Sequence, residues 1–166
     1  MLVTTHAPYD HPEVLRLIAQ IQAFYAERYG GGDDTPLRPE QFGPPFGYFL
    51  LGRVDGQTVA CGGWRRRDAV GPDDPSIRDG DAEIKRMYVV PEARGEGHAR
   101  AVLAELERTA AEAGRTRMIL ETGTKQPEAV GLYASSGYVP MERFGIYRFE
   151  PDSLCFTKPV RGTTLV

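Results

Sequence analysis

Residues 94–99 have the residue types and spacing to bind phosphate groups. They read Arg-Gly-Glu-Gly-His-Ala and follow the apolar, strand-like residues 83–90. Gly95 and Gly97 allow a tight turn with no Cβ in the way of a ligand. A helix that begins at this turn would offer N–H groups without intrahelical partners, and its positive end attracts anions. With Arg94 as a nearby cation, the pattern predicts a diphosphate site.

The alternative is that the glycines only end a loop before an ordinary core helix, because short glycine motifs arise easily by chance. The chain has neither the G-x-x-x-x-G-K-[ST] of a nucleotide triphosphatase nor, in this turn, the G-x-G-x-x-G of a dinucleotide fold. A helix is favoured after the turn because apolar residues recur at three- and four-residue spacing. They are Ala99, Val102, Leu103, Leu106, Ala110 and Ala113.

A second motif lies downstream, in residues 120–138. It contains A-x-x-L-Y-x-x-x-G-Y from Ala129 to Tyr138. The turn at 94–99 resembles the acyl-CoA pyrophosphate loop of the GNAT superfamily of N-acyltransferases, and the second motif looks like that superfamily's next strand, helix and strand. The resemblance covers about residues 46–140. Gln126 departs from it, since many members have Asn at this position.

The resemblance implies a mixed α/β fold with a central, mostly antiparallel, splayed sheet flanked by helices. It implies transfer of an acetyl group from acetyl-CoA to a primary amine of a small molecule, by direct attack in a ternary complex. Two alternatives stay open at this point: an acetyltransferase that modifies protein lysines or N-termini, and a non-catalytic domain that binds or senses acyl-CoA.

Two residues are candidates for acid–base catalysis, which amine acylation from a thioester requires. Glu83 lies on the strand before the turn, and a glutamate in this strand often serves as the base in the superfamily. It could instead be a solvent-facing residue paired with Lys85, which shares its face of the strand. The resemblance implies that Tyr133 faces the coenzyme sulfur as the general acid; a packing role is the alternative.

The resemblance also implies a set of coenzyme-binding residues, including a main-chain N–H near 87–89 that stabilises the oxyanion. They are Met87, Tyr88, Val89, Arg94, Gly95, Glu96, Gly97, His98, Ala99, Gln126 and Tyr133.

In the resemblance, the acceptor site comes from the first helix, the loop after it and the loop before Asp81. Acidic and aromatic side chains there suit a cationic amine. The predicted residues are Tyr25, Tyr29, Asp33, Asp34, Glu40 and Phe46.

Composition limits the other function classes. The chain has 166 residues, enough for one domain, which we expect to span 1–160 with a disordered tail at 161–166. A net charge of −3 argues against nucleic-acid binding. The two cysteines and three scattered histidines suggest no metal site. Without a leader or an apolar span, we expect a cytoplasmic protein with no membrane partner; a homodimer is left open.

The remaining elements follow from local patterns. Asp10 is the expected N-cap of a helix that runs to about Glu27 and ends at the glycines 30–32. Asp55 and Gly56 predict a hairpin between strands 48–54 and 58–64. The basic run 65–67 is expected to be a solvated strand end. Further strands are expected at 146–149 and 154–158.

Overall fold

The computed structural model describes residues 1–162, so part of the expected tail lies outside the described residues. Seven strands form one sheet in the order β1-β2-β3-β4-β5-β7-β6. The strands are β1 (Val3–His6), β2 (Gly47–Val54), β3 (Gln57–Arg67), β4 (Asp81–Val89), β5 (Arg117–Gly123), β6 (Val139–Met141) and β7 (Ser153–Pro159). The helices are α1 (Pro12–Tyr29), α2 (His98–Glu112) and α3 (Pro127–Ser135), with short 3₁₀ turns η1 (Pro39–Phe42) and η2 (Pro91–Ala93).

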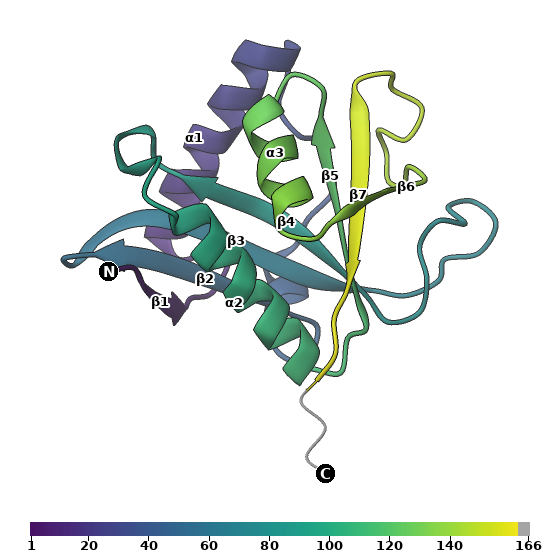
Figure 1. The fold of residues 1–166 in the computed structure, drawn as a ribbon, viewed down its shortest axis with the longest axis horizontal. Helices are drawn as coiled ribbons and strands as arrows, with labels where there is room; N and C mark the ends of the chain where they lie inside the picture. Colours follow the sequence, from purple (N-terminus) through teal and green to yellow (C-terminus); the bar gives the residue numbers. More distant parts are fainter. Residues whose placement is uncertain (163–166) are drawn as a thin grey trace.

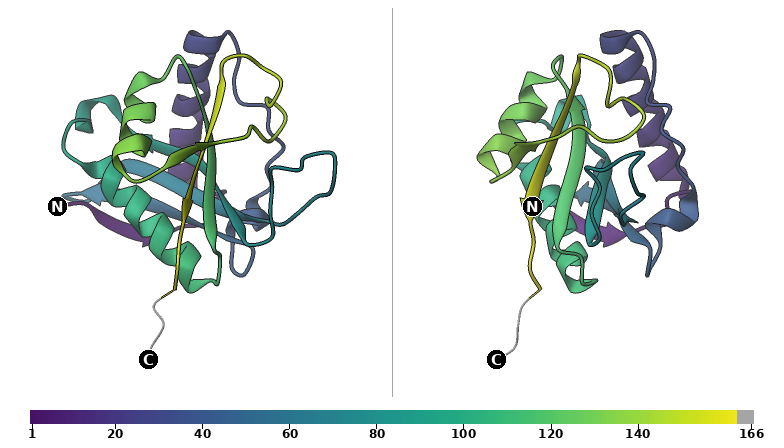
Figure 2. Two further views of the ribbon diagram at one scale, coloured as in Figure 1. Left: turned by 45° about the vertical axis from the view of Figure 1, so that its right-hand side comes forward. Right: turned by 90° about the vertical axis from the view of Figure 1, so that its right-hand side faces the viewer.

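The sheet lies between two helical layers. Helix α1 covers one face, and α2 and α3 cover the other (Figures 1 and 2). All strand pairs are antiparallel except β4 and β5, which run parallel. The predicted mixed α/β fold with a mostly antiparallel sheet is therefore confirmed.

Strands β4 and β5 pair over a short stretch and then separate. Asp81, Ala82 and Glu83 pair with Arg117, Met118 and Ile119, and no pairing follows. Figure 1 shows the two strands diverging from this point. Arg86 has a left-handed φ of 59°, and the β3–β4 register shifts opposite, between Cys61 and Gly63. This is a β-bulge, which bends a strand away from regular pairing.

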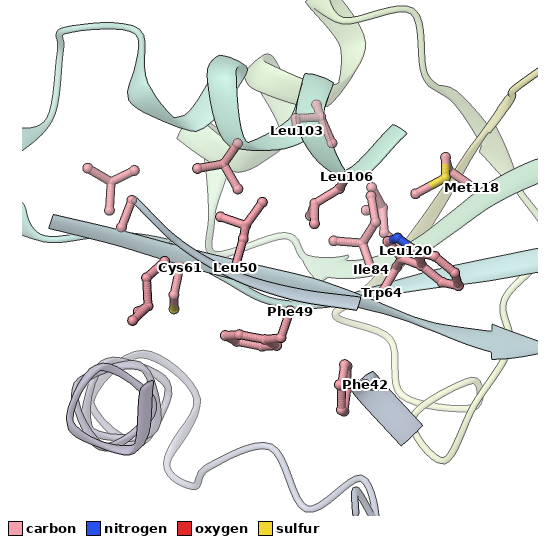
Figure 3. Close-up of a cluster of buried hydrophobic side chains, with 14 of the residues drawn as sticks. Phe42, Phe49, Leu50, Cys61, Trp64, Ile84, Leu103, Leu106, Met118 and Leu120 are labelled. Carbon is pink, nitrogen blue, oxygen red and sulfur yellow. The ribbon is translucent and has the colours of Figure 1, made fainter. Parts of the chain in front are cut away.

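The core packs against both faces of the sheet (Figure 3). On the α2 side, Leu103 and Leu106 are buried above Leu50. On the α1 side, Phe49 stacks edge-on against Phe42, with ring centroids 5.7 Å apart. Core residues on both faces pack against β3 and β4, so β4 keeps its place beside β3 where it separates from β5.

Two local predictions are confirmed, and one is wrong. Gly30 ends α1 in the left-handed conformation, and the hairpin turns at Asp55 and Gly56, both with positive φ. The N-cap of α1 is His11, not Asp10. His11 Nδ1 accepts from the Glu13 N–H at 3.1 Å, because Pro12 takes the first helical position that its fixed φ suits.

The predicted strand at 146–149 does not form. The chain turns there instead, through hydrogen bonds from Arg148 N to Gly145 O and from Glu150 N to Tyr147 O. Phe149 is 82% exposed, so no core contact draws this segment into the sheet. The edge strand on that side is β6, which pairs with β7. None of the described helices is long and apolar enough to cross a membrane.

Candidate active site

A cavity of about 750 Å³ opens where β4 and β5 separate. Residues of α1, β4, the turn before α2, β5 and α3 line it. Its formation follows from the bulge, because strands that stayed paired would fill this space with backbone. The cavity therefore connects the predicted phosphate turn with both faces of the sheet.

The turn before α2 presents main-chain donors to the cavity. In residues 95–100, no amide N–H has a backbone acceptor within the described part of the chain. Gly95 and Gly97 have φ of +82° and +83°, and a Cβ added to either would meet no atom within 4 Å. The turn is thus an open row of N–H groups at a helix N-terminus, which suits phosphate oxygens.

Side chains around this turn are held by short contacts. Arg94 Nε donates to Val89 O at 3.0 Å, and its guanidinium lies 5.5 Å from the Tyr88 ring centroid. Arg100, which also lines the cavity, donates to Ser135 Oγ at 2.6 Å. Ten of the eleven predicted coenzyme-binding residues line the cavity; Glu96 does not, because its carboxylate turns to His98 Nε2 at 3.0 Å.

Tyr133 lines the same cavity from α3. It is 8% exposed, and its ring packs against Tyr138 with centroids 5.7 Å apart. Burial raises the pKa of its hydroxyl well above the ordinary value, and the hydroxyl stays protonated at neutral pH. Gln126, at the start of the same helix, donates to Tyr29 Oη at 3.1 Å.

The bulge turns two consecutive cations toward one carboxylate. Lys85 Nζ and an Arg86 guanidinium nitrogen each lie 2.8 Å from Asp33 Oδ2. Burial alone would raise the pKa of Asp33, but Lys85 and Arg86 hold it well below its ordinary value. Asp33 is therefore already neutralised by protein groups, which corrects its expected role as a free carboxylate for a cationic acceptor.

Glu83 does not line the large cavity and is not solvent-facing. It is 3% exposed, and its Oε1 accepts from Arg65 Nε at 2.9 Å and from Arg67 at 2.8 Å. Burial would raise the pKa of Glu83, but Lys85 and the two arginines lower it. A carboxylate held this way is a poor proton acceptor, so the geometry does not support the predicted base.

The predicted acceptor residues divide into two groups. Tyr25, Tyr29, Asp33 and Asp34 line the large cavity. Glu40 and Phe46 do not: Glu40 is exposed on η1, and Phe46 is 56% exposed beside it. The loop at 30–34 therefore belongs to the site, and the segment at 40–46 packs away from it.

Sequence reasoning missed three residues on the acceptor side: Glu121, Tyr147 and Ser153. Tyr147 Oη accepts from Asp34 N at 2.7 Å and so joins two distant loops across the cavity. The only sequence signal for Glu121 is its position directly after the apolar residues 118–120, on the strand that follows the phosphate-turn helix.

A smaller cavity of about 210 Å³ adjoins this region. Both acidic and basic side chains line it, together with uncharged residues from two loops. They are Thr35, Pro36, Arg65, Arg67, Asp74, Glu83, Glu121, Gly145, Ile146 and Arg148. In residues 1–162, no cluster of three or more His, Cys, Asp or Glu side chains could hold a metal ion.

Comparison with known proteins decides the family. The acetyltransferase (GNAT) family matches residues 17–138. This chain belongs to that family. An IAA acetyltransferase of Azospirillum brasilense is 32% identical over 147 residues, which are 89% of this chain and 90% of that protein.

Solved structures of GNAT proteins have the same fold. A Klebsiella pneumoniae protein assigned to the acyl-CoA N-acyltransferases is 28% identical, with a TM-score of 0.75 and coverage of 96% of this chain and 98% of its own. A GNAT acetyltransferase of Elizabethkingia anophelis with acetyl-CoA bound is 12% identical, with a TM-score of 0.66 and coverage of 96% and 98%. The predicted acetyltransferase class is confirmed, and acetyl-CoA, the predicted cofactor, is bound in that GNAT neighbour.

Proposed function

We propose that this GNAT enzyme transfers an acetyl group from acetyl-CoA to a primary amine of a small molecule, by direct attack in a ternary complex. The observation that carries the proposal is the single cavity lined by the phosphate turn, Tyr133 and the loop at 30–34. Donor and acceptor can therefore meet without either one leaving the protein.

The coenzyme side fits acetyl-CoA. The free N–H groups of residues 95–100 would hold the diphosphate, with Arg94 and Arg100 as cations at its edges. The gap between β4 and β5 would then receive the pantetheine arm, with Gln126 at its side. The main chain after the bulge, at Met87, would supply the N–H for the oxyanion, since this is where β4 leaves regular pairing.

We infer that Tyr133 serves as the general acid, because it lines the cavity from α3. As the C–S bond breaks, the leaving thiolate takes the proton of the Tyr133 hydroxyl, and the tyrosine regains a proton from the attacking nitrogen. Its raised pKa keeps the hydroxyl protonated before the reaction. The net change forms an amide and free thiol and releases one proton from an ammonium acceptor.

The cysteines do not support a covalent acyl-enzyme. Cys61 lies outside the cavity lining, and its thiol contacts Arg86 O at 3.2 Å. Burial raises the pKa of Cys61 to about 12 and that of Cys155 to about 11, so neither is a thiolate at neutral pH. Direct attack by the amine is left as the simpler route.

A small acceptor is favoured over a protein chain because two loops meet over the acceptor side. Asp34 N donates to Tyr147 Oη at 2.7 Å, and this hydroxyl also lies 3.4 Å from Gly32 O. These contacts tie the two loops together at the edge of the cavity, which narrows the approach for a lysine-bearing peptide more than for a small amine.

The test is release of CoA thiol from acetyl-CoA with a panel of small amines, amino acids and lysine-bearing peptides. We expect thiol release with at least one small amine and none above background with peptides. Faster release with peptides would replace the small-molecule acceptor by a protein. Binding of acetyl-CoA without release for any acceptor would favour the non-catalytic alternative.

A further inference from the structure

The small cavity has an unpartnered carboxylate oxygen in its lining. Asp74, on the loop between β3 and β4, is 8% exposed and lines this cavity of about 210 Å³. Its Oδ2 accepts from Gly145 N at 2.8 Å, whereas its Oδ1 is buried and has no hydrogen-bond partner within residues 1–162. An unpaired, buried carboxylate oxygen is costly. A ligand that donates an N–H to Asp74 Oδ1 would remove this cost.

Two guanidinium groups in the same lining have donors to spare. Arg67, at the end of β3, donates through Nη1 to Glu83 Oε1 at 2.8 Å. Arg148, on the loop between β6 and β7, donates through Nη1 to Gly145 O at 2.8 Å. Both arginines are half-buried. Because a guanidinium has five N–H donors in a fork that matches a carboxylate, both can also bind a carboxylate of a ligand.

An ion-pair network beside the small cavity has more cations than carboxylates. Its carboxylates are Glu83 and Asp33, and the four cations that share them are Arg65, Arg67, Lys85 and Arg86. Even with the neighbouring Glu121 ionised, the cations remain in excess. Charges this far from water need partners of the opposite sign. A carboxylate of the ligand would supply part of the missing negative charge.

The lining as a whole fits a group that carries both an ammonium and a carboxylate. The ammonium would donate to Asp74 Oδ1, and the carboxylate would accept from Arg67 and Arg148. A carboxylate alone would leave Asp74 Oδ1 unpaired, and an ammonium alone would face the two guanidinium groups. A water molecule takes about 30 Å³ in the liquid, so the cavity has room for the α-amino carboxylate head of an amino acid.

Glu121 connects this head site with the acceptor side of the large cavity. It is half-buried on β5, and of the described residues that line the two cavities it alone lines both. One side chain is thus a shared wall. A short chain that leaves the head and passes Glu121 would enter the large cavity, where the thioester is expected.

We propose that the acceptor is a diamino acid, with its α-amino carboxylate head in the small cavity and its distal amine acetylated in the large one. This inference rests on the proposed function. The distal nitrogen forms the amide bond with the acetyl carbon as the C–S bond breaks. The distal ammonium loses two protons in all, one to the CoA thiolate and one to solvent. The head binds and orients the acceptor and changes no bond.

The first test measures kcat/KM for CoA thiol release with diaminobutyrate, ornithine and lysine, and with analogues of the best of them. One analogue lacks the α-amine, as ε-aminocaproate does for lysine, and another has an amide in place of the carboxylate. We expect each analogue to be about tenfold poorer or worse, the scale of one lost charged hydrogen bond. The proposal is overturned if both analogues match the diamino acid, or if amino acids without a distal amine react faster.

The second test removes the protein partners one at a time. Asp74→Asn should lower kcat/KM about tenfold with the best diamino acid but change it little with the analogue that lacks the α-amine. Arg148→Gln should do the same with respect to the analogue that lacks the carboxylate. Asp73→Asn and Arg143→Gln are matched controls, since both residues are exposed and line neither cavity. Equal losses with every acceptor would give Asp74 and Arg148 a structural role and overturn the proposal.

A binding measurement separates this inference from the proposed function. Norleucine has the head but no distal amine, so calorimetry should show that it binds, and that Asp74→Asn and Arg148→Gln weaken its binding. It should also compete with the diamino acid in the thiol assay. Norleucine binding with no thiol release for any acceptor would keep the head site and fail the proposed function. Thiol release with other amines, without norleucine binding, would fail the diamino acid assignment only.

Discussion

The two sides of the large cavity are built in different ways. The coenzyme side is a run of consecutive main-chain N–H groups at residues 95–100. The acceptor side is built from charged side chains far apart in the sequence, chiefly Asp33, Lys85 and Glu121. The first depends on backbone conformation and the second on how charges balance, so substitutions should affect them differently.

Charge balance on the acceptor side of the large cavity leaves one carboxyl group that titrates near neutral pH. Asp33 meets two cations and Glu83 three, and both carboxylates stay ionised over the working pH range. Glu121 is half-buried; desolvation and the nearby Asp33 and Glu83 raise its pKa, and Lys85 and a hydrogen bond from Ser153 oppose the rise. A fold can thus place several acids around a site and keep only one of them titratable near neutral pH.

The largest effect is expected from Asp33→Asn. It leaves Lys85 and Arg86, both nearly buried, without their shared carboxylate. Breaking a buried ion pair by removing one partner costs about 3–5 kcal/mol, so urea unfolding should show a loss of that order. Asp34→Asn is the matched control, since Asp34 is exposed. Similar stability for the two variants would mean that the Asp33 contacts add little to the fold.

Tyr133→Phe should have the next largest effect, and on turnover only. Loss of the hydroxyl removes the proton donor, so kcat should fall about a hundredfold while CoA affinity is unchanged. Tyr138→Phe also removes a buried hydroxyl, one that bonds Glu107 at 2.8 Å outside the cavity, and should retain kcat. Full kcat for Tyr133→Phe across pH 6–9 would return this residue to a packing role.

On the coenzyme side, Gly97→Ala should weaken CoA binding more than tenfold, or about 1.4 kcal/mol, in a titration of the purified protein. The added methyl group would stand where the diphosphate approaches the turn. Gly114→Ala is a close control: Gly114 has nearly the same φ, +81°, and equally open surroundings, but it does not line the cavity. If both variants bind CoA alike, the diphosphate does not approach the turn at Gly97.

The coenzyme side could be predicted from the sequence because it is a local structure, whereas the acceptor side could not. The turn at 95–97 and the helix after it are local, since glycine spacing and helical periodicity within twenty or so residues determine them. Both were predicted. The diverging strands were implied only by resemblance, and the bulge at Arg86 could not be located, because no residue pattern marks a left-handed arginine.

The acceptor side could not be predicted, because its charges pair across strands. Arg65 lies opposite Glu83 in the β3–β4 register, a relation that depends on the sheet and not on sequence spacing. The run 65–67 was expected to be solvated, yet alternation buries Arg65, half-buries Arg67 and exposes only Arg66. This pairing is also why Glu83 was a reasonable base in the sequence and is a poor one in the fold.

The smallest expected effect is on stability, and it tests the acceptor side without any substrate. In the folded protein the pKa of Glu121 is raised to about 7 from an ordinary 4.5. Between these two pH values the folded state holds a proton that the unfolded chain releases, so stability should fall as pH rises through this window. Above pH 7 the folded protein carries a poorly solvated carboxylate.

Glutamine has no such charge, so Glu121→Gln should be more stable than wild type at pH 8. The gain should be on the order of 1 kcal/mol, because partial solvent access reduces the full linkage value. At pH 4 to 5 the two proteins should unfold at similar urea concentrations. Glu107→Gln should lose stability at both pH values, since it breaks the contact with Lys158. If Glu121→Gln gains nothing at pH 8, Glu121 is not held in a poorly solvated position.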